Sequence, residues 1–530
     1  MLTPLHQYSL GDAANADAVL TALSDQFLIR SEAETALSRI YHDSFDWRLY
    51  LSGSVLYSKK DGRKKVLVWV PDGSEDAAET LTVSQGVPKF FWDMPQGPLR
   101  GKLAQLIEMR ALLPQVEVKG RVRQFKVLDG EEKTVLRFSI ESYASRMPGV
   151  GEFRELDQRI VLLPVRGYNS ISKRVSRILT KQMGLRPLAE GLLQAALTAI
   201  DRKPADYSSK LDFQFAPEDS AGSVARRIHL HLLDTMERNL PGTCANLDSE
   251  FLHDLRVAVR RARSALTQIK GVFNQEAVNA YNPRLSWIGQ ITGPSRDMDV
   301  YLLDYDLYRS SLPERFQADL DPLKEFLLAH RKSAYRSMTT QLKSKEFRSF
   351  LDEWRGFLNN SPVRHEGASA AELPVKMVAD KRIYRIYKRV LGEGAEINDS
   401  SPATAFHELR KSCKKLRYLI EFFQSLYTNE QIQPLIKALK VLLDNLGAFQ
   451  DTEVQANKLR EFAHQMVKEA QVPADTLLAM GMLVDGLLRR QQEARKDFHS
   501  CFEVFSGKEN RKEFKAIFSR YSGGIKNKQN

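Results

Sequence analysis

The spacing of hydrophobic residues changes once along the chain and predicts two kinds of architecture. Between about residues 40 and 165, apolar and polar positions alternate in short segments such as KKVLVWV and TVLRFSIESY, and turn-forming sequences such as PDGSED separate them. Alternation with a period of two is typical of strands that bury one face. Helical periodicity flanks these segments on both sides. We therefore predict an α+β domain with an antiparallel sheet over residues 1–200.

The rest of the chain predicts helices only. A polar stretch at residues 201–222 is interpreted as a linker, because turn-forming and charged residues dominate it. From residue 223 to 524, apolar residues recur three or four positions apart in almost every segment, which places them on one face of a helix. We expect an all-α domain here. The chain of 530 residues is therefore multidomain, as its length also suggests.

The helical part contains an internal duplication. The segments FLHDLRVAVRRARSALTQI and FHELRKSCKKLRYLIEFF align with His253 opposite His407, 154 positions apart (407 − 253). Further pairs match at the same offset without a gap, namely Arg256 and Arg410, Arg260 and Lys414, Arg263 and Arg417, Gly293 and Gly447, and Asp297 and Asp451. We expect one repeat at about residues 223–360 and the second at about residues 373–522, each with about four helices.

Each repeated helix carries a row of basic residues beside its apolar stripe. At about 100° per residue, the row from His253 to Arg263 falls within roughly an 80° arc, and its counterpart in the second copy does the same. We expect these rows to lack acidic partners one turn along the helix, so that an external anion would relieve their repulsion. A solvated surface is the usual role of such residues, but their recurrence in both copies favours a binding site. The candidate binding residues are His253, Arg256, Arg260, Arg261, Arg263, His407, Arg410, Lys414, Lys415 and Arg417.

The paired H-x-L-R-x-x-x-[RK]-[RK]-x-R segments, each followed by RDMDV or QDTEV, resemble the CHAD family, the conserved-histidine α-helical domain. The resemblance covers about residues 221–522. It implies two four-helix bundles related by approximate twofold symmetry, with a basic surface or pore that binds inorganic polyphosphate through the candidate binding residues. The second copy carries Lys414 and Lys415 in place of two arginines, and Gln450 in place of Arg296. Because lysine lacks the bidentate fork of arginine, we expect unequal contributions from the two copies.

The matched residues Asp297 and Asp451 allow a metal site as an alternative, since each begins a D-x-[DE] pair. Residues two apart on a helix point in different directions, so we favour a supporting role in which each Asp orients nearby Arg or His side chains. A zinc site is less favoured for the same reason and because arginines crowd the histidines. Its ligands would be His229, His231, His253 and His407.

The first domain is similar to the CYTH family in the order of its segments, from YHDSFDWRLYLSGSVLY to FRELDQRIVLLP followed by a helix. CYTH domains form an antiparallel barrel that binds triphosphate, and they precede CHAD domains in some chains. The alternating charges of this domain would line such a barrel or, as an alternative, the outer face of an ordinary sheet. The chain lacks the ExExK strand whose carboxylates bind the catalytic metal, and Glu155 with Asp157 would bind Mg²⁺ too weakly alone. We expect a barrel-like domain with no catalytic residues, metal or cofactor.

The amino-acid composition limits the classes of binding partner and the cellular setting that we expect for this protein. The formal net charge of +12 favours polyanions. Three cysteines without a CxxC pair exclude a disulfide framework. Neither a signal peptide nor a run of 18 apolar residues is present, so we expect a cytoplasmic protein with no membrane segment, associated with polyphosphate granules.

The leading hypothesis is thus a protein that binds inorganic polyphosphate and is not an enzyme. A metal-dependent triphosphatase or polyphosphate hydrolase in the first domain is one alternative. A nucleic-acid-binding protein is the other, although the basic rows lack the interleaved aromatic residues that stack on bases. The sequence leaves the oligomeric state open.

Overall fold

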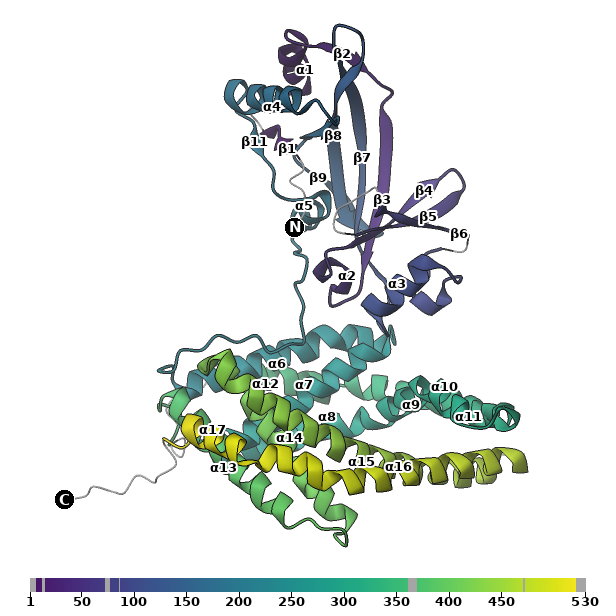
Figure 1. The fold of residues 1–530 in the computed structure, drawn as a ribbon, viewed down its shortest axis with the longest axis vertical. Coiled ribbons are helices and arrows are strands. Elements are labelled where there is room, and N and C mark those ends of the chain that lie inside the picture. The colour runs from purple at the N-terminus through teal and green to yellow at the C-terminus, as the bar shows by residue number, and fades with distance from the viewer. Residues whose placement is uncertain are drawn as a thin grey trace, which may run out of the picture. The chain divides into compact units, whose positions relative to one another are not determined.

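The computed structural model describes residues 6–11, 15–71, 77–84, 86–360, 369–469 and 472–520. The chain divides into two compact units, Met1–Ser208 and Ser209–Asn530, which we describe separately (Figure 1). The predicted end of the second repeat, at about residue 522, and that of the helical domain, at residue 524, lie outside the described residues.

The first unit is built on one antiparallel sheet of 11 strands. The strand order is β11-β1-β10-β8-β7-β3-β4-β5-β6, with β2 paired to β7 and β9 paired to β8. The strands are β1 (His6–Ser9), β2 (Leu28–Ser31), β3 (Thr35–Asp43), β4 (Val55–Asp61), β5 (Lys64–Val70), β6 (Glu79–Val83), β7 (Leu113–Leu128), β8 (Thr134–Met147), β9 (Val150–Glu155), β10 (Arg159–Pro164) and β11 (Arg186–Pro187). The prediction of an antiparallel α+β domain is confirmed.

The sheet is open, so the prediction of a barrel is wrong. In the described part of the unit, β11 pairs only with β1 and β6 only with β5, which leaves two edges that do not meet. Helices cover both faces instead. Hydrophobic residues of α1 (Ala16–Ser24) and α4 (Asn169–Arg177) pack on one face, and Ala196 and Leu197 of α5 (Leu192–Ala199) pack on the other. Because side chains of α5 fill the second face, strands do not have to close around it. Along the chain, α2 (Arg48–Leu51) follows β3, and α3 (Pro98–Ile107) precedes β7.

The second unit is all-α, as predicted. The first copy contains α6 (Ala221–Cys244), α7 (Ser249–Gln268), α8 (Gln275–Ile291), α9 (Gly293–Leu303), α10 (Tyr305–Ser310), α11 (Asp321–Leu342) and α12 (Lys345–Asn360). The second copy contains α13 (Val375–Ala395), α14 (Ala403–Phe423), α15 (Asn429–Glu469), α16 (Ala474–Ser506) and α17 (Lys508–Phe518). Even among the described residues each copy therefore holds more than the four helices expected. No helix in the described segments is long and apolar enough to cross a membrane.

One local difference separates the two copies. The helix that follows the repeated segment is broken at Thr292 in the first copy, where α8 ends and α9 begins, but it continues through 41 residues as α15 in the second. Pro294 stands two positions after the break, and Ala448 occupies the matching place in the second copy. Since proline has no N–H and clashes with the preceding turn, it favours the start of a new helix. The long α15 and α16 lie side by side (Figure 1).

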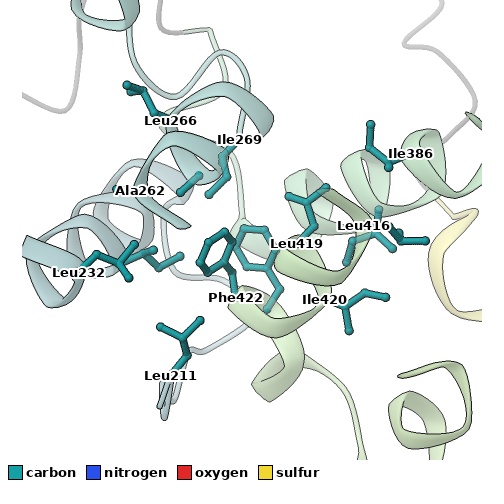
Figure 2. Close-up of a cluster of buried hydrophobic side chains, with 14 of the residues drawn as sticks. Leu211, Leu232, Ala262, Leu266, Ile269, Ile386, Leu416, Leu419, Ile420 and Phe422 are labelled. Carbon is teal, nitrogen blue, oxygen red and sulfur yellow. The ribbon is translucent and has the colours of Figure 1, made fainter. Parts of the chain in front are cut away.

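A single hydrophobic core joins the two copies. The stripe of α7, including Leu255 and Ala262, and the stripe of α14, including Leu416, are buried in the same cluster. Figure 2 shows Ala262 and Ile269 from the first copy facing Leu419 and Phe422 from the second. The basic rows that border these stripes are thereby held within one body.

The segment predicted as a linker, residues 201–222, makes contacts within each of the two units. In the first unit, Trp47 Nε1 donates a hydrogen bond of 2.9 Å to Asp206 Oδ1. In the second unit, Leu211 and Phe215 are buried in the helical core. The segment therefore contributes to the folding of each unit.

Candidate functional site

The first basic row lies on α7, whose start is defined by a side-chain cap. Asp248 accepts hydrogen bonds from the backbone N–H groups of Glu250 (2.9 Å) and Phe251 (3.1 Å), which sets the helix start. Burial of the apolar stripe leaves the row along its border. His253 and Arg256 are consequently half-buried, whereas Arg260 is exposed.

Arg256 is anchored by neutral groups. Its Nη1 donates to the carbonyl oxygen of Gly289 (2.8 Å) and to Thr292 Oγ1 (2.7 Å) at the end of α8. Burial, followed by repulsion from Arg260 and Arg296 and opposed by Asp297, lowers the pKa of Arg256 to about 10. The guanidinium is thus fixed in place while its charge lacks a bound carboxylate among the described residues.

The second row on α14 makes more polar contacts. His407 Nδ1 lies 2.9 Å from Gln450 Oε1, and Arg410 Nη2 lies 3.0 Å from Asp451 Oδ1. Both partners stand on α15. Gln450 replaces the Arg296 of the first copy, so the change of residue exchanges a cation for a group that orients the histidine.

The rows of the two copies meet at Lys414. Burial is the main cause that lowers the pKa of Lys414 to about 8, and repulsion from Arg410, Arg260 and Arg417 adds to it. Arg260 belongs to the first copy, so cations from both copies act on one ammonium group. Neither Lys414 nor Arg260 forms an ion pair with any residue that the structure describes.

We call Arg256, Arg260, Arg410 and Lys414 the central cations. Each interacts electrostatically with the next, in the order Arg256, Arg260, Lys414 and Arg410. Only Arg410 among them has a carboxylate partner within the described part of the chain. The four cations lie on α7 and α14, which are in contact with each other.

The expectation that the rows lack acidic partners one turn along is wrong at one position. Glu421 follows Arg417 by four residues on α14, and its Oε1 lies 2.6 Å from Arg417 Nε. Its Oε2 lies 3.1 Å from Nη2 of Arg261, a candidate binding residue of the first copy. Arg261 also donates to the carbonyl oxygen of Ser209 (3.1 Å). Arg261 is therefore a contact between the copies.

The remaining candidates, Arg263 and Lys415, are half-buried. Arg263 Nε is buried without a hydrogen-bond partner in the described structure, and no ion pair of its side chain is found there. The hydrogen bond from Lys411 is the main cause that lowers the pKa of Glu408, and the charges of Lys411, His407 and Lys415 act in the same direction.

The repeated glycines accompany the repeated arginines. A Cβ atom at Gly293 would lie 3.8 Å from Arg256 Nη1, and one at Gly447 would lie 3.6 Å from Arg410 Nη2. Both distances are ordinary contacts, so glycine leaves space that a larger side chain would share with the guanidinium. Each matched Arg and Gly pair thus marks the same helix contact in its copy.

The two candidate supporting aspartates behave differently. Asp451 binds Arg410, as a supporting residue would. Burial raises the pKa of Asp297, and the nearby Arg256 and Lys458 oppose that rise. Its neighbour Asp299 is the buried carboxylate, accepting from Arg331 Nε (2.6 Å) and from the hydroxyl of Tyr335 (2.7 Å).

The structure does not bring the histidines of the alternative zinc site together. His229 is fully buried beside Trp354 (5.2 Å between ring centroids) and Phe273 (5.6 Å), and burial lowers its pKa to about 3. Among the residues that the structure describes, no group of three or more His, Cys, Asp or Glu side chains is arranged to hold a metal ion.

Some of the alternating charges of the first unit form ion pairs within that unit. Arg146 Nε lies 2.8 Å from Glu117 Oε2, and Arg121 Nε lies 3.7 Å from Glu34 Oε1. Glu155 is exposed, and Asp157 accepts a hydrogen bond from Ser9 (3.3 Å). These contacts favour the alternative of a polar sheet surface.

Sequence reasoning missed two residues that shape the site. Glu421 could have been found by its spacing from Arg417. Lys458 acts on Asp297 from the other copy, and no local pattern indicates that contact. Contacts between elements distant in sequence leave no periodic signal.

Residues 227–460 match the family model of the CHAD domain. This segment is a CHAD domain. All candidate binding residues lie within it, from His253 to Arg417, as do both supporting aspartates. The match ends inside α15, so α16 and α17 lie beyond the matched residues.

The CHAD-domain chain has distant relatives. Proteins from two strains of Mycobacterium tuberculosis, whose names describe them as uncharacterised, are 23% identical to it over 258 residues. That alignment covers 46% of this chain and 45% of each relative, so the chain aligns with about half the length of these curated relatives.

Two solved structures are also similar. The CHAD domain from the plant Ricinus communis is 21% identical, with a TM-score of 0.48, and the match covers 57% of this chain and 96% of that one. PptA from Streptomyces chartreusis is 17% identical, with a TM-score of 0.41, and the match covers 54% of this chain and 100% of that one.

Proposed function

We propose that this protein binds inorganic polyphosphate at the surface formed by α7 and α14. The observation that supports the proposal is that Arg260 of the first copy is near enough to Lys414 of the second copy to help lower the pKa of its ammonium group, so cations of both rows act together. A bound polyanion would relieve the repulsion that lowers the pKa of Lys414. Charge-assisted hydrogen bonds from arginine and lysine suit phosphate oxygens.

A flexible chain of phosphates fits this surface better than a nucleic acid does. The central cations can contact successive phosphates, and such contacts carry no base sequence information. The row segments of α7 and α14 contain no aromatic residue between His253 and Arg263 or between His407 and Arg417 that could stack on a base. In competition, long-chain polyphosphate is expected to displace single-stranded DNA from the protein.

The first unit has no proposed catalytic role. Its described carboxylates do not converge on a common point, and several are held by arginines. The proposal is tested by incubating the full chain with triphosphate or ATP and Mg²⁺ or Mn²⁺. Phosphate release that is lost in Glu155→Ala or Asp157→Ala would instead favour the hydrolase alternative.

The binding proposal is tested by removing two central cations from the full chain. The double variant Arg260→Ala, Lys414→Ala is expected to bind long-chain polyphosphate at least about tenfold more weakly. A charged contact of the partly buried Lys414 contributes roughly 1 to 3 kcal/mol, and the exposed Arg260 adds a smaller contribution. The slope of log affinity against log salt should become shallower by about two, by analogy with phosphate contacts to nucleic acids. Equilibrium titrations at several salt concentrations measure both quantities.

The matched control is Arg389→Ala with Arg489→Ala. These arginines are paired with Glu393 and Asp485 within their own helices, so their removal changes the net charge equally without touching the central cations. A folded double variant of the central cations that binds like this control would refute the proposed site.

A further inference from the structure

Glu421 occupies two cations of the proposed polyphosphate surface. Its carboxylate binds Arg417 Nε at 2.6 Å and Arg261 Nη2 at 3.1 Å. The Glu421 side chain is 20% exposed and the Arg261 side chain 17%, so water screens this contact less than a fully exposed pair. An internal anion therefore takes the place that a phosphate would occupy at this end of the surface.

The duplication provides a natural comparison. The position that matches Glu421 in the first copy is Thr267, 154 residues earlier, and its hydroxyl donates to the carbonyl oxygen of Arg263 (2.8 Å). Arg263 therefore has no carboxylate in the place where its counterpart Arg417 has one. The two copies present matched arginines, one available and one neutralised.

We infer that Glu421 is an intramolecular competitor of the polyanion, which limits access to Arg417 of the second copy and to Arg261 of the first copy. The inference rests on the proposed function. A phosphate chain that reaches this end must displace Glu421 or lie beside it, and like charges at short distance repel each other. Glu421 thus determines how far along α14 the bound chain extends.

The inference makes opposite predictions for two substitutions in the full chain. Glu421→Gln keeps the shape of the side chain and removes its charge, so affinity for long-chain polyphosphate should rise roughly two- to tenfold at low salt. The salt slope should steepen by about one, because loss of one carboxylate charge gives this end of the surface one more net positive charge for phosphate to neutralise. Thr267→Glu places a carboxylate four residues after Arg263 and should reduce affinity by a similar factor.

The control is Asp485→Asn, which changes the net charge as Glu421→Gln does. Asp485 is an exposed residue of α16 paired with Arg489, outside the proposed surface. An equal gain in affinity from Asp485→Asn would mean that net charge alone explains the result, and it would overturn the inference.

Other outcomes are equally informative. If Glu421→Gln leaves affinity unchanged or lowers it while the protein stays folded, Glu421 is a structural tie between the copies and the inference fails. If Glu421→Gln does not fold, an unchanged affinity of Thr267→Glu overturns the inference by itself. If the wild-type chain binds no polyphosphate at any salt concentration, the proposed function fails, and the inference with it. Loss of affinity in Arg260→Ala, Lys414→Ala with no response to both Glu421→Gln and Thr267→Glu would reject only the inference.

Discussion

Lys414 of the proposed binding site is held at a cost in stability. Its ammonium group is partly buried and faces Arg410, Arg260 and Arg417, and burial together with these charges disfavours its charged form. Nothing in the described structure neutralises it by an ion pair. Such an arrangement is unfavourable for folding alone, so it is best explained by an anion that binds there.

The pKa of Lys414 predicts the pH dependence of binding. A bound polyanion favours the charged ammonium, so binding above pH 8 must take up a proton. Affinity should change little below about pH 7 and should fall as the pH rises through 8 toward 9, as measured by titration at constant ionic strength. Lys414→Arg keeps its charge in this range and should flatten the fall. An unchanged fall in this variant would assign it to other groups.

The stability of the free protein should have the opposite pH dependence. The pKa of Lys414 is about 8 in the folded protein, whereas an unperturbed lysine side chain has a pKa of 10.5, so the unfolded chain binds more protons between these values. The contribution of Lys414 to stability therefore improves as the pH rises through this window. Lys414→Met should raise the free energy of unfolding near pH 7 by on the order of 1 kcal/mol, and with it the melting temperature. The same variant should bind polyphosphate more weakly. A melting temperature lower than wild type would contradict this account.

The helices α7 and α14 are built on one pattern but differ in how their arginines are used. Arg256 is anchored by a carbonyl and a hydroxyl oxygen, whereas Arg410 binds Asp451. The C-terminal arginines differ in the same sense, because only Arg417 has a carboxylate one turn along. Duplication has thus preserved the positions of the cations without preserving their availability.

The two rows should therefore contribute unequally to affinity. Arg256→Ala with Arg263→Ala removes two cations that no described carboxylate binds, and we expect a loss of at least about tenfold. Arg410→Ala with Arg417→Ala removes cations already engaged by Asp451 and Glu421, so the loss should be smaller. Both double variants are compared by equilibrium titration with polyphosphate. An equal or greater loss in the second pair would contradict the difference in availability.

In the whole molecule, each unit has its own hydrophobic core, and every candidate binding residue lies in the second unit. The chain from Ser209 onward contains the central cations, the packed segment around Leu211 and Phe215, and the core that joins both copies. This unit should fold independently, because its buried apolar clusters are formed by its own residues.

We expect the fragment of residues 209–530 to bind polyphosphate within about threefold of the full chain, because the charged contacts that carry affinity are retained. Circular dichroism first establishes that the fragment is helical, and equilibrium titration then compares the affinities. Loss of most affinity in a folded fragment would place the site in the first unit instead.

Local periodicity was sufficient for much of this architecture. The change from a period of two to spacings of three and four residues predicted the antiparallel sheet and the helical unit, because burial of one face imposes these spacings on any strand or helix. The duplication followed from matched residues such as His253 and His407. The repeated segments also identified the CHAD domain before any tertiary contact was considered.

Contacts between distant elements were decided only by the tertiary structure. The sheet is open and α5 covers one of its faces, whereas its strands by themselves are compatible with either an open sheet or a barrel. Likewise, the sequence places Arg260 and Lys414 on separate helices, and only the shared core of α7 and α14 brings their charges together. Side-chain spacing along one helix determines which residues share a face, but packing determines which faces meet.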